Sequence, residues 1–164
     1  MDVESTTANS QSNFFNHLKG EVFHLTARFR YDSILQSGKI LNNQNNQFVI
    51  NPGSKESFGR SKGWVCLFDL RKSTPQLINS IVEHYNFEWF SETEGNKKVY
   101  DLACFILDSN YYCRIIPNSR APRGEQNIRN AEVWIDECVP IFWIKKVLFV
   151  KVSMPIPPIE KFCS

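Results

Sequence analysis

The sequence lacks the features by which membrane and secreted proteins are usually recognised. No apolar run approaches the roughly 20 residues that span a bilayer, so we expect no membrane association. Residues 1–13 are rich in serine, threonine, asparagine and glutamine and contain no apolar segment, so we expect no secretory signal there. This composition predicts a disordered tail over residues 1–13, followed by a single domain over residues 14–164.

The chain also has little net charge and no recognisable metal-binding motif. The formal net charge is only +2, so a basic surface for nucleic acid has to be local. The five cysteines are odd in number and none has zinc-site spacing, so no metal is expected. Three of them lie in apolar strand-like segments, where a free cysteine behaves as a small buried hydrophobe. We therefore expect a cytoplasmic protein, because free thiols suit a reducing compartment.

What is present is a series of apolar strand-like segments, concentrated in the second half of the chain. Two helices are predicted: one over 28–37 that ends at Gly38, and one that opens at Thr74 and Pro75. Glu94, Gly95 and Asn96 predict a hairpin tip, and 54–62 and 117–130 are expected to be loops. Strands are predicted over residues 21–25, 63–70, 99–108, 111–116, 131–135 and 145–152. This mixed order indicates an α+β domain rather than a doubly wound sheet.

Two of these strands each carry one polar residue that apolar packing does not explain. His24 interrupts the apolar alternation of residues 21–26, and Glu132 stands at the head of the strand at 131–136. A histidine early in the chain and a glutamate late in it suit a cleft built where two sheets diverge.

The residues around this pair resemble a known family. FHLT at 23–26, followed by ILQSG at 34–38, resembles the opening motif of ADP-ribosyltransferase toxins of the DarT type, which modify nucleic-acid bases. RNAEVWI at 129–135, followed by Val139 and Pro140, is similar to the closing motif of that family. GWVCLFDLR at 63–71 also resembles abortive-infection proteins of the AbiGi type. The match covers the two ends of the chain and is loose in the middle.

The resemblance implies an α+β fold with a split mixed β-sheet, a few flanking helices, and NAD bound between the two halves as co-substrate. It implies transfer of ADP-ribose to a DNA or RNA target by a toxin or phage-defence effector, for which a cognate antitoxin is a further partner. Glu132 takes the catalytic role. Its carboxylate suits the oxocarbenium-like centre that forms when nicotinamide leaves, because it can hydrogen-bond the ribose 2′-hydroxyl and favour the developing charge.

The remaining site residues follow from the same resemblance. Arg60 is the second catalytic candidate, since a guanidinium suits phosphate oxygens, and Gly59 lets the backbone come close to the ligand. Arg28 competes for the phosphate contact, and His24 and Thr26 are expected to hold a ribose. Two apolar residues are candidates for the nicotinamide pocket: Trp64 and Phe68. The loop before Glu132 is expected to bind the nucleic acid through Arg120, Arg123, Asn127 and Arg129.

Each assignment has a plainer alternative. Glu132 can be a surface residue at a strand edge, His24 a satisfied core histidine, and Arg60 part of a solvated basic loop. For the whole chain, the alternatives are a protein-directed transferase, an NAD-consuming hydrolase, or a non-catalytic module that binds NAD or nucleic acid, such as an antitoxin.

Overall fold

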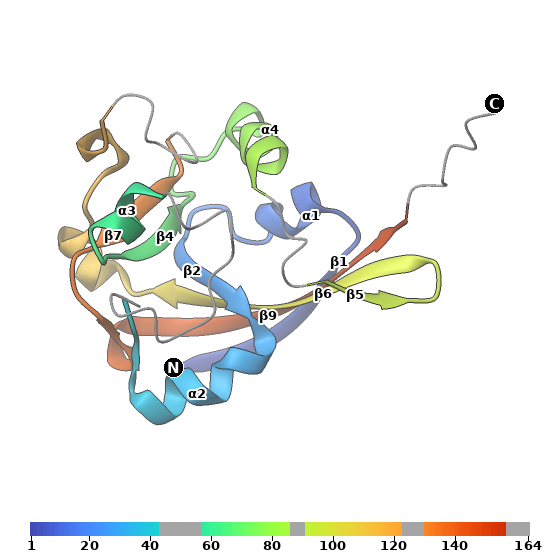
Figure 1. Cartoon of the computed structure of the whole chain (residues 1–164), viewed down its shortest axis with the longest axis horizontal. Coiled ribbons are helices and arrows are strands. Elements are labelled where there is room, and N and C mark those ends of the chain that lie inside the picture. Colours follow the sequence, from blue (N-terminus) through green and yellow to red (C-terminus); the bar gives the residue numbers. More distant parts are fainter. Residues whose placement is uncertain (43–56, 86–90, 123–129, 157–164) are drawn as a thin grey trace.

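The computed structural model describes residues 1–42, 57–85, 91–122 and 130–156. These residues form a mixed β-sheet with α1 and α4 on one face and α2 on the other (Figure 1). The α+β class predicted from the sequence is therefore confirmed.

The strands are β1 (Asp2–Ala8), β2 (Val22–Ala27), β3 (Lys39–Ile40), β4 (Val65–Asp69), β5 (Ser91–Glu94), β6 (Lys97–Leu107), β7 (Glu132–Ile135), β8 (Val139–Pro140) and β9 (Ile144–Pro155). The α-helices are α1 (Gln11–Asn16), α2 (Tyr31–Ser37), α3 (Phe58–Ser61) and α4 (Pro75–His84). Short 3₁₀ helices are η1 (Arg28–Arg30), η4 (Ser109–Arg114), η5 (Asn118–Arg120) and η6 (Ile141–Trp143).

The large sheet has the strand order β1-β9-β6-β2-β4-β7, and β5 pairs with β6 outside this path. β1 runs parallel to β9, whereas the other neighbours are antiparallel. A separate two-stranded sheet joins β3 to β8.

Both faces of the large sheet are buried, which explains the continuous apolar run in β6. Every residue from 102 to 107 is buried, because successive side chains point alternately to the two faces. The face under α1 and α4, here the α1/α4 face, is built around Phe14, Phe23 and Phe68. The opposite face, here the α2 face, is built around Phe105 and Phe149.

Local signals predicted several element boundaries correctly. The Thr74 hydroxyl accepts a hydrogen bond from the Leu77 amide at 3.2 Å, and α4 begins at Pro75 as expected. Gly38 ends α2 with a φ of 69°, a conformation that glycine adopts without a Cβ penalty. The predicted hairpin tip joins β5 to β6.

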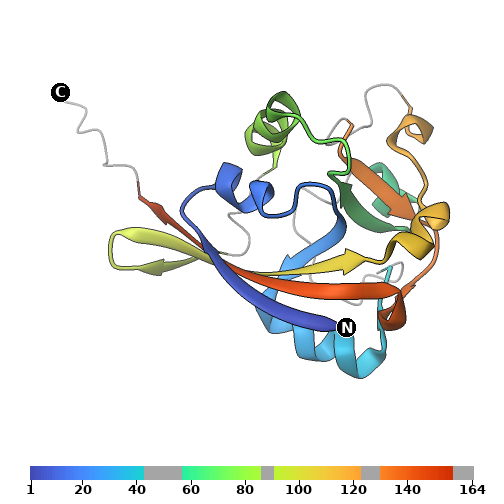
Figure 2. The same ribbon diagram turned by 180° about the vertical axis from the view of Figure 1, so that it is seen from behind.

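The predicted disordered tail over 1–13 is wrong for the segment that forms β1 and the start of α1. β1 pairs with β9 from Asp2 opposite Lys146 to Ala8 opposite Val152 (Figure 2). Its side chains are mostly exposed at the edge of the sheet, so the sequence carries no apolar alternation. Backbone pairing along the long strand β9 supplies the order that composition did not indicate.

Two further predictions fail locally. Residues 109–114 form η4 instead of a strand, with the Asp108 carboxylate accepting from the Asn110 amide at 2.9 Å. Only Ile116 of the predicted strand makes a β-bridge, and its partner is Trp134. The expected loop at 54–62 contains α3, which packs through Phe58 onto Trp134.

Candidate active site

The strands β2 and β4 are paired over only two residues. Val22 lies opposite Asp69 and Phe23 opposite Phe68. Beyond Phe23, β2 continues along β6 as far as Ala27, while β4 continues along β7. From His24 onward, β2 and β4 therefore no longer pair with each other as neighbouring strands.

The His24 side chain occupies this position between β2 and β4. Its Nδ1 lies 2.9 Å from the carbonyl oxygen of Cys66. A carbonyl can only accept, so Nδ1 carries the hydrogen and donates it. Desolvation lowers the pKa of His24, although the residue is not completely buried. The hydrogen bond to Cys66 raises this pKa, and the positive charge of Arg30 lowers it further. A neutral ring with its proton on Nδ1 presents Nε2 as a hydrogen-bond acceptor.

Glu132 is the first residue of β7 and only 8% exposed, so the surface alternative is wrong. Its Oε1 accepts a hydrogen bond from Trp134 Nε1 at 3.1 Å. The backbone is held as well: Asn118 Nδ2 donates to the Glu132 carbonyl at 2.8 Å, and Asn118 Oδ1 accepts from the Asn130 amide at 3.3 Å. The carboxylate therefore has a defined position inside the protein.

Cys66 links these two residues, which the sequence analysis did not foresee. Its carbonyl accepts from His24, and its thiol lies beside the Glu132 side chain. Burial raises the pKa of this thiol, and the neighbouring Glu132 carboxylate raises it further, whereas Ser57 and the Arg60 charge lower it. The thiol is therefore protonated and unsuited to act as a nucleophile. No signal in its apolar strand distinguishes Cys66 from a packing residue.

Gly59 makes a close backbone approach, as predicted, but to a protein side chain. A Cβ at this position would overlap the Cδ1 and Nε1 atoms of Trp134. The same indole contacts Phe58 at a ring-centroid distance of 5.3 Å and donates to Glu132. In this structure Gly59 therefore serves the packing that holds the glutamate. Trp64 lies at the edge of the cluster, 5.7 Å from Phe58 between ring centroids.

Glu132 and His24 project from opposite faces of the sheet. Glu132 is paired with Phe68, and Phe68 with Phe23, so all three share the α1/α4 face. His24 follows Phe23 and is paired with Phe105, on the α2 face. A ligand that contacts both side chains therefore has to pass between β2 and β4.

The other predicted NAD-binding residues are distributed along the molecule. Phe68 is 8% exposed and stacks on Phe23 at 5.4 Å, inside the apolar cluster beside Glu132. Thr26 is buried opposite Ala103. The Arg28 guanidinium lies 3.2 Å from the centroid of the Phe149 ring, beyond the end of β2 that is remote from Phe23.

The predicted nucleic-acid contacts are only partly visible. Arg120 is exposed at the end of η5, and Asn118 at the start of the same 3₁₀ helix donates to the Glu132 carbonyl. Arg123, Asn127 and Arg129 lie outside the described residues.

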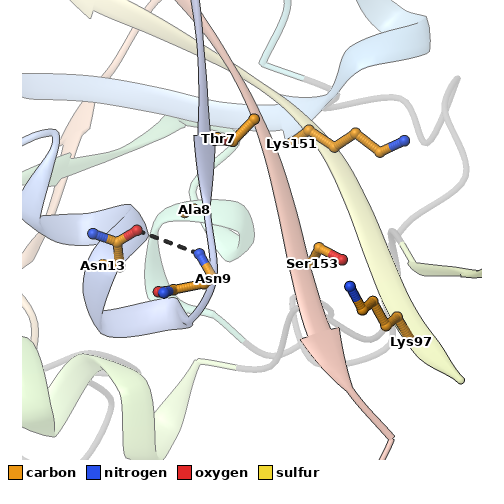
Figure 3. A pocket seen from close by; sticks show the side chains of 7 residues that line it. All are labelled: Thr7, Ala8, Asn9, Asn13, Lys97, Lys151 and Ser153. Atoms are coloured by element: carbon orange, nitrogen blue, oxygen red, sulfur yellow. Dashed lines mark hydrogen bonds between the residues drawn. The ribbon is translucent and has the colours of Figure 1, made fainter.

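Two hollows lie at the other end of the sheet, away from Glu132. The first has a volume of about 360 Å³ and is lined by Thr7, Ala8, Asn9, Asn13, Lys97, Lys151 and Ser153 (Figure 3). The second, of about 280 Å³, includes Arg28, Phe29 and Asp101. The Lys151 ammonium between them pairs with Glu94 at 3.1 Å. Neither hollow includes a residue that contacts Glu132.

Known proteins offer no further guide to this site. Comparison of the chain with protein-family models, with curated proteins and with solved structures finds no match in any of the three. Among the described residues, no group of three or more His, Cys, Asp or Glu is placed to hold a metal ion. No helix in the described ranges is long and apolar enough to cross a membrane.

Proposed function

We propose that this chain is an NAD-dependent ADP-ribosyltransferase that modifies a base of DNA or RNA, on a split-sheet fold of the ADP-ribosyltransferase type. The resemblance of the motifs around His24 and Glu132 suggests this function. One structural observation carries it: β2 and β4 part after Phe23, and the two candidate residues lie on either side of that parting. As a toxin or phage-defence effector, such an enzyme acts in the cytoplasm and is restrained by a cognate antitoxin.

Glu132 has the surroundings that the proposed chemistry requires. The bond from nicotinamide to the ribose breaks with its electron pair leaving on nicotinamide, and the ribose carbon becomes electron-poor. A fixed carboxylate accepts a hydrogen bond from the neighbouring 2′-hydroxyl and favours that charge. A base atom of the nucleic acid then bonds to the ribose carbon and loses its proton, for which Glu132 is an acceptor.

His24 and Arg60 supply the binding contacts in this proposal. The unprotonated Nε2 of His24 accepts from a hydroxyl of the other ribose, because Nδ1 is committed to Cys66. Arg60, in α3, lies close enough to Cys66 for its charge to act on the thiol. In the proposal, its guanidinium supplies the cation for the pyrophosphate of NAD.

A non-catalytic binding module is the second candidate. The Glu132 carboxylate accepts a hydrogen bond from Trp134, and it lies on the opposite face from His24. Both observations fit a glutamate that stabilises the sheet in a protein that binds NAD or nucleic acid without turnover.

Nicotinamide release from NAD distinguishes the two candidates. We expect wild type to release nicotinamide with single-stranded DNA or RNA present, and Glu132→Gln to lose at least about 100-fold in rate. The variant retains an amide oxygen that accepts the Trp134 hydrogen bond, so we expect it to fold. Circular dichroism checks this expectation. Glu137→Gln is the matched control, since that carboxylate is half-exposed and pairs with Arg114 at 3.6 Å.

The other outcomes are equally informative. NAD binding without release under any condition favours the binding module. Release that Glu132→Gln leaves unchanged removes Glu132 from the mechanism. A wild-type protein that binds no NAD overturns the family assignment as a whole.

A further inference from the structure

Ser57, immediately before α3, carries a buried hydroxyl without a hydrogen-bond partner among the described residues. The residue is 4% exposed and its Oγ is fully buried. It occupies the N-cap position of α3, yet its side chain makes no capping hydrogen bond. Buried hydroxyls are almost always paired, because removing one from water without a partner is costly. Ser61 in the same helix is exposed, yet its hydroxyl is paired and donates to the Phe58 carbonyl at 2.8 Å.

The Ser57 hydroxyl lies beside the Cys66 sulfur, the same atom on which Glu132 and Arg60 act. Sulfur is a weak acceptor, so this contact does not satisfy the hydroxyl. The packing agrees with this position, because Phe58 and Gly59, which follow Ser57, lie against the Trp134 indole that donates to Glu132. The Ser57 hydroxyl and the Glu132 carboxylate therefore lie on the same side of β4.

We propose that Ser57 is a ligand-binding residue of the Glu132 site, and that it holds a sugar hydroxyl together with Glu132. A hydroxyl group fits both partners at once: its hydrogen donates to the carboxylate, and its oxygen accepts from Ser57. A phosphate or a carboxylate ligand fits less well, because it brings negative charge onto Glu132. The inference rests on the proposed function for the identity of the sugar, which is the ribose next to nicotinamide.

The experiment compares Ser57→Ala with Ser61→Ala in the full-length protein. ADP-ribose and NAD affinities are measured by isothermal titration calorimetry, and melting temperatures without ligand. Ser57→Ala removes an unpaired hydroxyl, so we expect an unchanged or higher melting temperature and an ADP-ribose affinity lower by about fivefold to tenfold. Ser61→Ala removes a satisfied hydroxyl, so we expect a lower melting temperature and wild-type affinity.

This design separates failure of the inference from failure of the proposed function. If wild type binds ADP-ribose or NAD and Ser57→Ala binds equally well, the Ser57 inference is overturned and the proposed function stands. If Ser57→Ala lowers the melting temperature as much as Ser61→Ala, the hydroxyl is structural and the inference is overturned. A wild type that binds neither compound overturns both.

Discussion

The two ends of the large sheet are built in different ways. From the hairpin end, β6 and β9 run along the centre of the sheet; they are 11 and 12 residues long and pair from Lys97 opposite Pro155 to Leu107 opposite Ile144. At the Glu132 end, β4 and β7 are five and four residues long, and β4 pairs with β2 over two residues. Buried polar groups gather at this second end: Ser57, Asn118 and Glu132.

The difference indicates that the long strands support the short strands at the Glu132 end. Long antiparallel strands satisfy their backbone groups along their whole length and bury apolar side chains on both faces. The short strands at the Glu132 end depend on that scaffold, because they also bury polar side chains at a cost in free energy. Both hollows described above lie at the hairpin end; Lys97 and Lys151 are exposed there, and no buried polar side chain lines the first hollow. The two ends therefore differ in kind, because the described hollows lie at one end and the buried polar side chains gather at the other.

The largest effect is expected from overpacking the Glu132 end. Gly59→Ala places a Cβ into the Trp134 indole, and overpacking should lower the free energy of unfolding by about 2–3 kcal/mol. Urea denaturation followed by circular dichroism measures this loss. The double variant with Trp134→Phe should show a coupling energy of about 1 kcal/mol or more, since the two sites are in contact. Wild-type stability of Gly59→Ala would mean that α3 is not locked against Trp134.

A smaller effect on the free energy of unfolding is expected when the pH is lowered, because of His24 between β2 and β4. Because desolvation lowers the folded-state pKa of His24 below the ordinary value of about 6.5, only the unfolded chain gains this proton as the pH falls below that value. Stability should therefore fall from about pH 6.5 downward until the folded state also protonates. His24→Gln retains a donor for the Cys66 carbonyl and removes the titration.

Urea denaturation at pH 7.5 and pH 5.5 measures this difference. Between these values, wild type should lose about 1 kcal/mol more of its unfolding free energy than His24→Gln. Equal losses in the two proteins would show that His24 is not desolvated in the folded state.

The smallest effect is expected at the hairpin end. Lys151→Ala removes an ion pair with Glu94 whose side chains are 51% and 56% exposed. Exposed pairs contribute little, so the unfolding free energy should change by less than about 0.5 kcal/mol. Nicotinamide release should also be unaffected. Loss of release in Lys151→Ala would move the functional site to the hollow in Figure 3 and reverse the comparison of the two ends.

The sequence singled out Glu132, which the structure buries, but gave no sign of the residues that surround it. Glu132 was distinguishable because it is a charged residue at the head of an apolar strand, and the structure buries it. Its neighbours were not distinguishable in this way. Cys66 lies in an apolar run and Gly59 in a segment predicted as a loop, so nothing local indicates that one contacts Glu132 and the other Trp134.

The sequence by itself determined the features that depend on a few neighbouring residues. These are the start of α4 at Thr74 and Pro75, the end of α2 at Gly38, and the turn between β5 and β6. Tertiary structure decided the rest. β1 became ordered only by pairing with β9, more than 140 residues away along the chain. His24 reaches the Cys66 carbonyl across 42 residues. Such contacts depend on strand order and register, which are set when the whole sheet assembles and not by any local pattern.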